Sequence, residues 1–294
     1  MLAYLNGHFL PRSSASISVD DRGFVFGDGV YEVWRAVGGT LFESDKHLAR
    51  LLRGLDRLSI ARPDLASGER LHGVAHRLLT DSDLLEADAT FYVEITRGAA
   101  PRTHHFPVNP VAPTVYATVN RLVTPEDVRE RGAECITVPD VRWLRCDIKS
   151  IALLGNCMLR TLAADAGCAE AILVRDGLLT EASASNVFVV KGGTVLVPPK
   201  SHLILPGITY DVVLEILRAN AIAHEVRPVT ENELRSADEI WITSSSREVL
   251  AITTLDGKPV GRGKDAGIPG PVGARVYALY QDFKAKIMRA PAHA

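Results

Sequence analysis

Lys149 is a lysine in an apolar setting, in the run from Asp147 to Leu154. An ammonium beside Ile151 and Leu153 would lose hydration, which lowers the pKa of the amine and frees a nucleophilic lone pair. Nucleophilic amines of this kind react with carbonyl groups. The same pattern is also typical of a lysine whose stem packs on apolar neighbours while its ammonium reaches water. Lys149 is therefore a candidate nucleophile that needs support from the rest of the chain.

A glutamate followed by small residues is the second candidate. Glu181 leads into the Ala- and Ser-rich segment 182–186. Small side chains let a flat heterocycle approach closely, and the carboxylate could keep a ring nitrogen protonated. The alternative is a solvated glutamate at a strand end, followed by an ordinary Ser-rich turn.

Three separate segments carry groups that bind anions. Ile208 and Thr209 follow Gly207 at the start of an expected helix, where backbone N–H groups are free to bind an anion. Ser244, Ser245 and Ser246 follow an expected strand, and Arg50 could supply a full positive charge. Each is ordinary alone, as a helix cap, a turn or a surface arginine, but together they suit a phosphate monoester. The glycine-rich loops typical of nucleoside triphosphate and dinucleotide sites are not present in the sequence.

The segment 96–107, a loop that contains Pro101 and Pro107, is the fourth candidate. Arg102 and His104 lie within it. An arginine can bind a carboxylate through two parallel hydrogen bonds, and an imidazole can add a further donor. The alternative is a polar surface loop.

The elements that must position these residues divide near residue 120. In the first part, the turn Asn6-Gly7 predicts a hairpin, and Gly38-Gly39 predicts a second one. The leucines after Ser44 have helical spacing, so the pattern predicts a helix capped by Ser44, and a further helix is predicted over 71–79. Strands are predicted over 90–97 and 113–120. Hairpins mixed with helices in this way indicate an α+β fold.

The second part mixes strands and helices without an internal repeat. Helices are predicted after Thr124-Pro125, over 151–166, over 209–220, after Thr230 and over 272–287. Strands are predicted over 169–174, 186–190, 194–197, 239–243 and 248–253. Several strands in one region suggest a closed or semi-closed sheet. The predicted domains are 1–120, the smaller, and 121–294, the larger.

Composition limits the class of protein. The 294 residues carry a net charge of −2 and a pI near 6.5, which argues against a nucleic-acid partner or an acidic membrane surface. No run of 18 apolar residues predicts a membrane span, and the N-terminus lacks the features of a signal peptide, so a cytoplasmic protein is expected. The four cysteines recur every eleven residues, a spacing that matches no metal site, and reduced thiols with no bound metal are expected.

Taken together, these motifs resemble the fold-type IV aminotransferases, which depend on pyridoxal 5'-phosphate (PLP), and among them the D-amino acid aminotransferases. The resemblance runs over about residues 4–260, in order and spacing, and is carried by the segments 26–33, 47–51, 96–104, 147–150, 181–188, 207–209 and 243–245. It implies a two-domain α+β enzyme with a smaller N-terminal α/β domain and a larger C-terminal domain built on a pseudo-barrel sheet.

The resemblance also assigns roles. Lys149 would form the Schiff base with PLP and later move the substrate proton, and Glu181 would pair with the pyridine nitrogen. The remaining cofactor-binding residues implied are Arg50, Leu205, Ile208, Thr209, Ser244 and Ser245. Tyr31, Arg102 and His104 would bind the substrate α-carboxylate, the last two from the neighbouring subunit, and Val33 and Ser246 complete the substrate site. The implied reaction is ping-pong transamination between a D-amino acid and a 2-oxo acid, of the D-alanine/2-oxoglutarate type, in a homodimer with shared active sites.

Several alternatives remain open. Tyr210 follows the Gly-Ile-Thr turn where arginine is common in this family, Ser246 replaces a common threonine, and His105 doubles the loop histidine, so the substrate side chain is left undefined. Branched-chain L-amino acid transaminases and (R)-amine transaminases share the lysine and the glutamate but lack this arrangement of Arg102 and His104, and aminodeoxychorismate lyase shares the scaffold. A Ser–Lys hydrolase using Ser150, or a non-catalytic protein that binds small anions, would belong to a different class.

Overall fold

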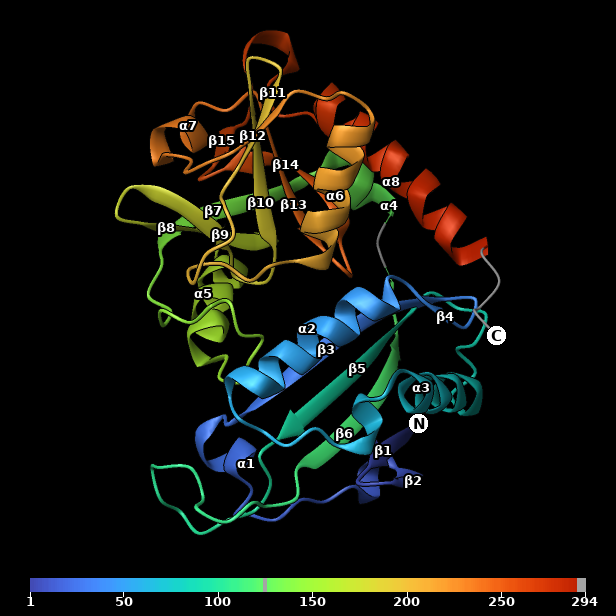
Figure 1. Cartoon of the computed structure of the whole chain (residues 1–294). Coiled ribbons are helices and arrows are strands. Elements are labelled where there is room, and N and C mark those ends of the chain that lie inside the picture. The colour runs from blue at the N-terminus through green and yellow to red at the C-terminus, as the bar shows by residue number, and fades with distance from the viewer. Residues whose placement is uncertain (124–125, 290–294) are drawn as a thin grey trace. The chain divides into compact units, whose positions relative to one another are not determined.

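The computed structural model describes residues 1–123 and 126–289, which form two compact units (Figure 1). The first unit holds residues 1–123, 148–153 and 287–289, and the described part of the second holds 126–147 and 154–286. The segment that carries Lys149 thus returns to the first unit, although the sequence-based division places it in the second part. The predicted domains 1–120 and 121–294 stay a prediction, because a compact unit need not be one that folds alone.

The first unit is a six-stranded antiparallel sheet with helices. Its strands are β1 (Leu2–Leu5), β2 (His8–Pro11), β3 (Gly29–Val37), β4 (Thr40–Leu41), β5 (Ala89–Thr96) and β6 (Thr114–Arg121), in the order β2-β1-β6-β5-β3-β4. Its helices are α1 (Arg22–Phe26), α2 (Ser44–Arg57) and α3 (Gly68–Asp81), with 3-10 turns at Arg12–Ser14 and Asp64–Ala66. Both predicted hairpins are confirmed: Asn6 and Gly7 adopt positive φ angles of 48° and 94° between β1 and β2.

Helices α2 and α3 cover one face of this sheet. Every second residue of β3 and β5 points into the resulting core, where Trp34 and Phe91 are fully buried. Leu51 and Leu55 of α2 and Leu78 of α3 pack into the same core. Figure 1 shows α2 lying along β3. The opposite face of the sheet is therefore left to carry half-buried residues.

The predicted cap of α2 is wrong. Ser44 is the first helical residue, and Glu43, in a left-handed conformation with φ of 51°, stands at the N-cap without a side-chain hydrogen bond. The Ser44 hydroxyl instead lies 2.7 Å from Nε2 of His72 on α3. A tertiary partner thus takes the hydroxyl that the local pattern assigns to the helix end.

The second unit is a nine-stranded mixed sheet, curled as a half-barrel, with helices around it. Its strands are β7 (Ala133–Pro139), β8 (Glu170–Arg175), β9 (Leu178–Ala182), β10 (Asn186–Lys191), β11 (Thr194–Val197), β12 (His224–Val226), β13 (Glu239–Ser244), β14 (Glu248–Leu255) and β15 (Lys258–Pro259). The order is β12-β11-β10-β13-β14-β7-β8-β9, and β15 pairs with β14. The predicted α+β fold with a pseudo-barrel sheet is confirmed. The sequence patterns gave no sign of β7, which pairs in parallel with both β8 and β14.

The helices of this unit are α4 (Glu126–Arg131), α5 (Leu154–Asp165), α6 (Ile208–Ala219), α7 (Glu231–Arg235) and α8 (Pro271–Arg289), and η3 (Gly263–Asp265) is a 3-10 turn. The capping box predicted at Thr230 and Glu233 is confirmed. The predicted cap at Thr124-Pro125 lies outside the described residues. The helix predicted from Ile151 begins at Leu154, because the N–H of Ile151 donates to the carbonyl of Gly29 in the first unit.

Two further findings concern the described residues as a whole. None of their helices is long and apolar enough to cross a membrane. All four cysteines are free thiols; Cys135 and Cys146 are buried, Cys168 is half-buried and Cys157 is exposed.

Candidate active site

Lys149 is held against the open edge of β3. The N–H of Tyr31 donates to the carbonyl of Lys149 at 3.0 Å, and Val30 and Ser150 form a β-bridge. This edge is free because β4 pairs only with the last residues of β3. The approach requires Gly29, since a Cβ there would lie 2.8 Å from the carbonyl oxygen of Ile95 and 2.9 Å from Cδ1 of Ile151. A glycine in β3 therefore lets the lysine segment pack against the strand.

The side chain of Lys149 is half-buried over an aromatic ring. Its Nζ lies 4.2 Å from the centre of the Tyr31 ring, within the range of a cation–π contact. The Tyr31 ring lies 5.8 Å from that of Tyr92, whose hydroxyl donates to Glu94 at 2.6 Å. Val33 shares this half-buried face of the sheet, because it follows Tyr31 by two positions in β3.

Arg50 forms a buried ion pair behind that face. Its Nε and Nη2 donate to the two carboxylate oxygens of Glu32 at 2.8 and 2.7 Å, and Nδ1 of His47 lies 3.0 Å from the same carboxylate. Burial alone would raise the pKa of Glu32, but the charges of Arg50 and His47 outweigh it and hold the pKa well below its usual range. Burial also lowers the pKa of His47. The sequence patterns gave no sign of Glu32 as the partner of Arg50.

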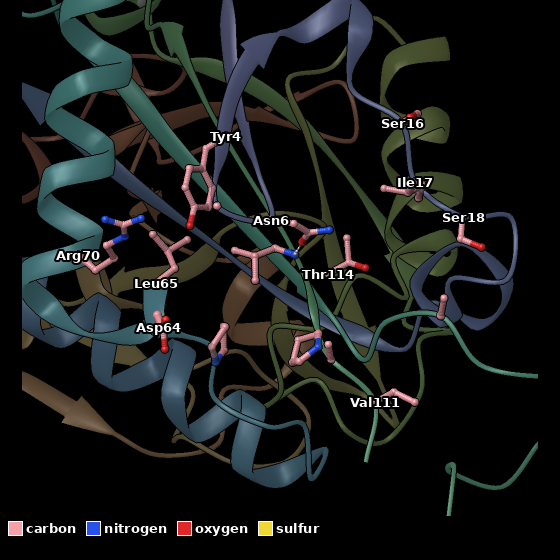
Figure 2. A pocket seen from close by; sticks show the side chains of 16 residues that line it. Tyr4, Asn6, Ser16, Ile17, Ser18, Asp64, Leu65, Arg70, Val111 and Thr114 are labelled. Carbon is pink, nitrogen blue, oxygen red and sulfur yellow. Dashed lines mark hydrogen bonds between the residues drawn. The ribbon is translucent and has the colours of Figure 1, made fainter. Parts of the chain in front are cut away.

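Arg102 and His104 contact the same aromatic ring. Both are exposed and both lie against Phe26 of α1, with Cζ of Arg102 5.4 Å and the His104 ring 5.8 Å from the centre of the Phe26 ring. A surface hollow of about 810 Å³ lies at the two stems of their loop, which contribute Ala99 and residues 111–115 (Figure 2). None of the predicted site residues lines this hollow.

In the second unit, Glu181 lies at the end of β9 and is only 4% exposed. Its carboxylate accepts hydrogen bonds from Nη1 of Arg142, from the side-chain amide of Asn186 at 3.1 Å and from the N–H of Leu205 at 3.0 Å. Burial raises the pKa of Glu181 to about 7, against the opposing charge of Arg142. Glu181 is thus a buried carboxylate that can hold or release a proton near neutral pH.

Arg142 is a site residue that the sequence patterns did not reveal. It is buried, and Asp140 accepts from its Nε and Nη2 at 2.9 Å each. Its third charged contact is Glu181. Because Asp140 and Arg142 follow β7, which was not predicted, their placement could not be inferred. The signal available in the sequence is an aspartate and an arginine two positions apart, shortly before Lys149.

The start of α6 adjoins Glu181 through Asn186. The Asn186 amide also donates to the carbonyl of Leu205 at 2.9 Å, and a Cβ at Gly207 would lie 2.1 Å from its side-chain oxygen. The helix begins at Ile208 and Thr209 with no side-chain cap, so the backbone N–H groups of its first turn have no acceptor within the helix. These N–H groups form a ready anion site.

Further donors follow β13, which pairs with β10. The hydroxyl of Thr243, opposite Asn186 in the register, is buried and has no partner among the described residues. The hydroxyls of Ser244 and Ser246 lie 3.4 Å apart, and the intervening residue, Ser245, is half-buried. An unpartnered buried hydroxyl beside an uncapped helix fits the needs of a phosphate group.

The predicted site residues thus fall into two groups. The first unit holds Tyr31, Val33, Arg50, Arg102, His104 and Lys149; the second holds Glu181, Leu205, Ile208, Thr209, Ser244, Ser245 and Ser246.

A mixed two-unit fold with a half-buried lysine, a buried glutamate and an uncapped helix start is the arrangement expected of a class IV aminotransferase. The chain belongs to this family: amino-transferase class IV matches residues 29–255. Class IV aminotransferases use PLP, which makes this chain a PLP-dependent enzyme.

Individual relatives agree with this family. The chain is 40% identical over 282 residues to a D-alanine aminotransferase of Bacillus licheniformis and 39% identical to one of Staphylococcus epidermidis, with 96% of both chains covered in each case. Among solved structures, the branched-chain amino acid aminotransferase of Escherichia coli shares the fold, with a TM-score of 0.85 at 20% identity, over 96% of this chain and 94% of that one.

Proposed function

We propose that this chain catalyses PLP-dependent, ping-pong transamination between a D-amino acid and a 2-oxo acid, of the D-alanine/2-oxoglutarate type. The observation that carries the proposal is the likeness to D-alanine aminotransferases over nearly the whole chain. The position of Lys149, half-buried over Tyr31, suits the central amine of such an enzyme.

The residues of both units fit the cofactor. When bound, PLP supplies an electron sink for the negative charge that develops when an amino acid loses its Cα proton. Lys149 would hold the cofactor covalently, and Glu181 would bind its ring nitrogen. The first turn of α6, at Ile208 and Thr209, would bind the phosphate through N–H groups that have no acceptor in the helix. Ser244, Ser245 and Arg50 would complete the phosphate site, and Leu205 would pack on the ring.

Proton transfer falls to Lys149. Once the substrate amine has displaced it from the cofactor, the uncharged Nζ would accept the proton from the substrate Cα and deliver it to C4′ of the cofactor. The backbone hydrogen bond with Tyr31 fixes the position of the Lys149 backbone, so the amine can occupy few positions. Arg142 keeps Glu181 oriented through a buried ion pair.

Substrate recognition rests on Tyr31, Arg102 and His104, which bind the α-carboxylate, while Val33 and Ser246 contact the side chain. Arg102 and His104 are exposed and lie against Phe26 in their own chain. This placement supports the proposal that they complete the site of a neighbouring subunit in a homodimer. A cytoplasmic location is part of the proposal and rests on the sequence alone.

A spectroscopic experiment tests the function. The purified holoenzyme is mixed with D-alanine or with L-leucine, and the absorbance of the bound cofactor is followed. Loss of the original band with D-alanine, but not with L-leucine, is expected. A response to L-leucine alone would favour a branched-chain transaminase, and a response only to an (R)-amine would favour an amine transaminase. Repeated turnover of aminodeoxychorismate to pyruvate, without a keto acid acceptor, would favour aminodeoxychorismate lyase. A protein that takes up no PLP would contradict the proposal as a whole.

A further inference from the structure

Two buried arginines share one carboxylate at the base of the loop 101–107. Asp28 accepts from Nε of Arg22 at 2.7 Å and from Nε and Nη2 of Arg97 at 2.7 and 2.9 Å. All three residues are buried, with exposed fractions of 2%, 6% and 9% for Arg22, Arg97 and Asp28. The cluster therefore holds one positive charge more than its carboxylate can balance.

The loop supplies one acceptor and one aromatic ring to these arginines, while Arg97 also donates to the carbonyls of Leu58 and Ser59 outside the loop. Nη1 of Arg22 donates to the carbonyl of Thr103 at 2.7 Å. The guanidinium carbon of Arg97 lies 3.7 Å from the centre of the Phe106 ring, and that of Arg22 lies 6.0 Å from it. A cation over an aromatic face is stabilised more as the cation is desolvated, and Arg97 is buried although Phe106 is half exposed. The two arginines of the cluster thus hold the loop against the rest of the first unit.

The anchored positions lie between and just after the two proposed carboxylate-binding residues. Thr103 stands between Arg102 and His104, and Phe106 follows His104 by two positions. Arg22 also places its guanidinium 4.7 Å from the ring of Phe26, the ring against which Arg102 and His104 lie. An otherwise exposed loop is therefore held through its backbone between the residues that must meet the substrate and through a side chain just after them.

From these contacts we propose that Arg22, Arg97 and Phe106 are positioning residues, which hold Arg102 and His104 in the geometry that binds the substrate α-carboxylate. The proposal rests on the proposed function, since it assigns the loop to that substrate. A loop that is already ordered loses little conformational freedom on binding, so the anchor strengthens substrate binding. Arg102 and His104 hold the carboxylate before and during the reaction alike, so loss of the anchor raises KM more than it lowers kcat.

Phe106 offers the sharpest test, because it is half exposed and its replacement spares the buried ion pairs. Phe106→Leu removes the aromatic face but keeps apolar bulk, whereas Phe106→Tyr keeps the face. Val108→Ala is the matched control, since Val108 follows in the same loop and is 90% exposed. Each variant is measured as holoenzyme for kcat and KM with D-alanine, and by hydrogen–deuterium exchange of the peptide that spans 101–109.

For Phe106→Leu we expect a rise in KM of about tenfold with kcat changed by less than about threefold, and faster exchange of 101–109. Phe106→Tyr and Val108→Ala should match the wild type in KM and in the exchange rate of 101–109. An unchanged KM and unchanged exchange in Phe106→Leu, or equal losses in Phe106→Leu and Phe106→Tyr, would overturn the proposal. If the wild type does not react with D-alanine, the proposed function fails, and the exchange rates still decide whether Phe106 anchors the loop.

Discussion

The ammonium nitrogen of Lys149 lies 4.2 Å from the centre of the Tyr31 ring, and the same two residues are joined by a backbone hydrogen bond of 3.0 Å. The register of one short β-bridge therefore determines the positions of both the Lys149 amine and the Tyr31 ring that it contacts. Because that bridge depends on Gly29 and the open edge of β3, the geometry of the lysine is a property of the sheet as well as of its own segment.

Lys149→Ala should abolish transamination, with a loss of at least about 10³-fold in kcat, since covalent and acid–base roles are both removed. Steady-state turnover with D-alanine and 2-oxoglutarate measures the effect. Lys258→Ala, which changes an exposed lysine of β15, serves as the control and should retain full activity. Turnover in Lys149→Ala would remove this lysine from its central role.

Arg142→Ala should destabilise the protein by about 3–5 kcal/mol, because it leaves Asp140 and Glu181 buried without their shared cation. Arg145→Ala is the matched control: Arg145 is half exposed, pairs with Asp147 and should contribute less than about 1 kcal/mol. Urea unfolding at neutral pH measures both. Equal losses of unfolding free energy in the two variants would show that the buried network contributes no more to stability than a surface ion pair.

Glu181→Gln should change how stability depends on pH in the cofactor-free protein. The folded-state pKa of Glu181, about 7, lies above its ordinary value of 4.5, so the wild type gains most from this group below pH 4.5 and loses that gain as pH rises to 7. The free energy of unfolding of the wild type, relative to Glu181→Gln, should fall by up to about 3 kcal/mol across this window. A constant difference between pH 4.5 and 7 would contradict the raised pKa.

Glu32→Gln should show the opposite sign. The folded-state pKa of Glu32 lies below its ordinary value of 4.5 because Arg50 and His47 outweigh burial, so its stabilisation is full above pH 4.5 and is lost as pH falls further. At pH 7 the variant should be less stable than the wild type by about 3–5 kcal/mol, since Arg50 loses its buried partner. Chemical unfolding at several pH values should show this gap narrowing below pH 4.5; a gap that widens there would refute the assignment.

Arg102→Met should weaken binding of α-carboxylate substrates, with a rise in KM for D-alanine of about 10- to 100-fold, as expected for the loss of a charge-assisted hydrogen bond. Amines without a carboxylate should be little affected. Arg12→Met, at another exposed arginine, provides the comparison. An equal effect of Arg102→Met on both kinds of substrate would argue against a carboxylate contact.

Local signals predicted much of the fold. The hairpin turns at Asn6-Gly7 and Gly38-Gly39 and the capping box at Thr230 are confirmed, because each is stabilised within a few residues of sequence. Ser44 and Ile151 show where such signals fail. In both cases a polar group that could serve a helix end binds a partner that is distant in the chain, His72 for the first and Gly29 for the second.

The family, the fold class and the candidate residues Lys149 and Glu181 could be predicted from the sequence, since residue types in a fixed order are a property of the chain. Which charges meet depends on how the strands pair in three dimensions. Arg142 reaches Glu181 across 39 positions and Arg97 reaches Asp28 across 69, because strand pairing brings their elements together. The same holds for Lys149. The sequence identifies its amine as a candidate nucleophile, but the position of that amine over Tyr31 depends on the free edge of β3.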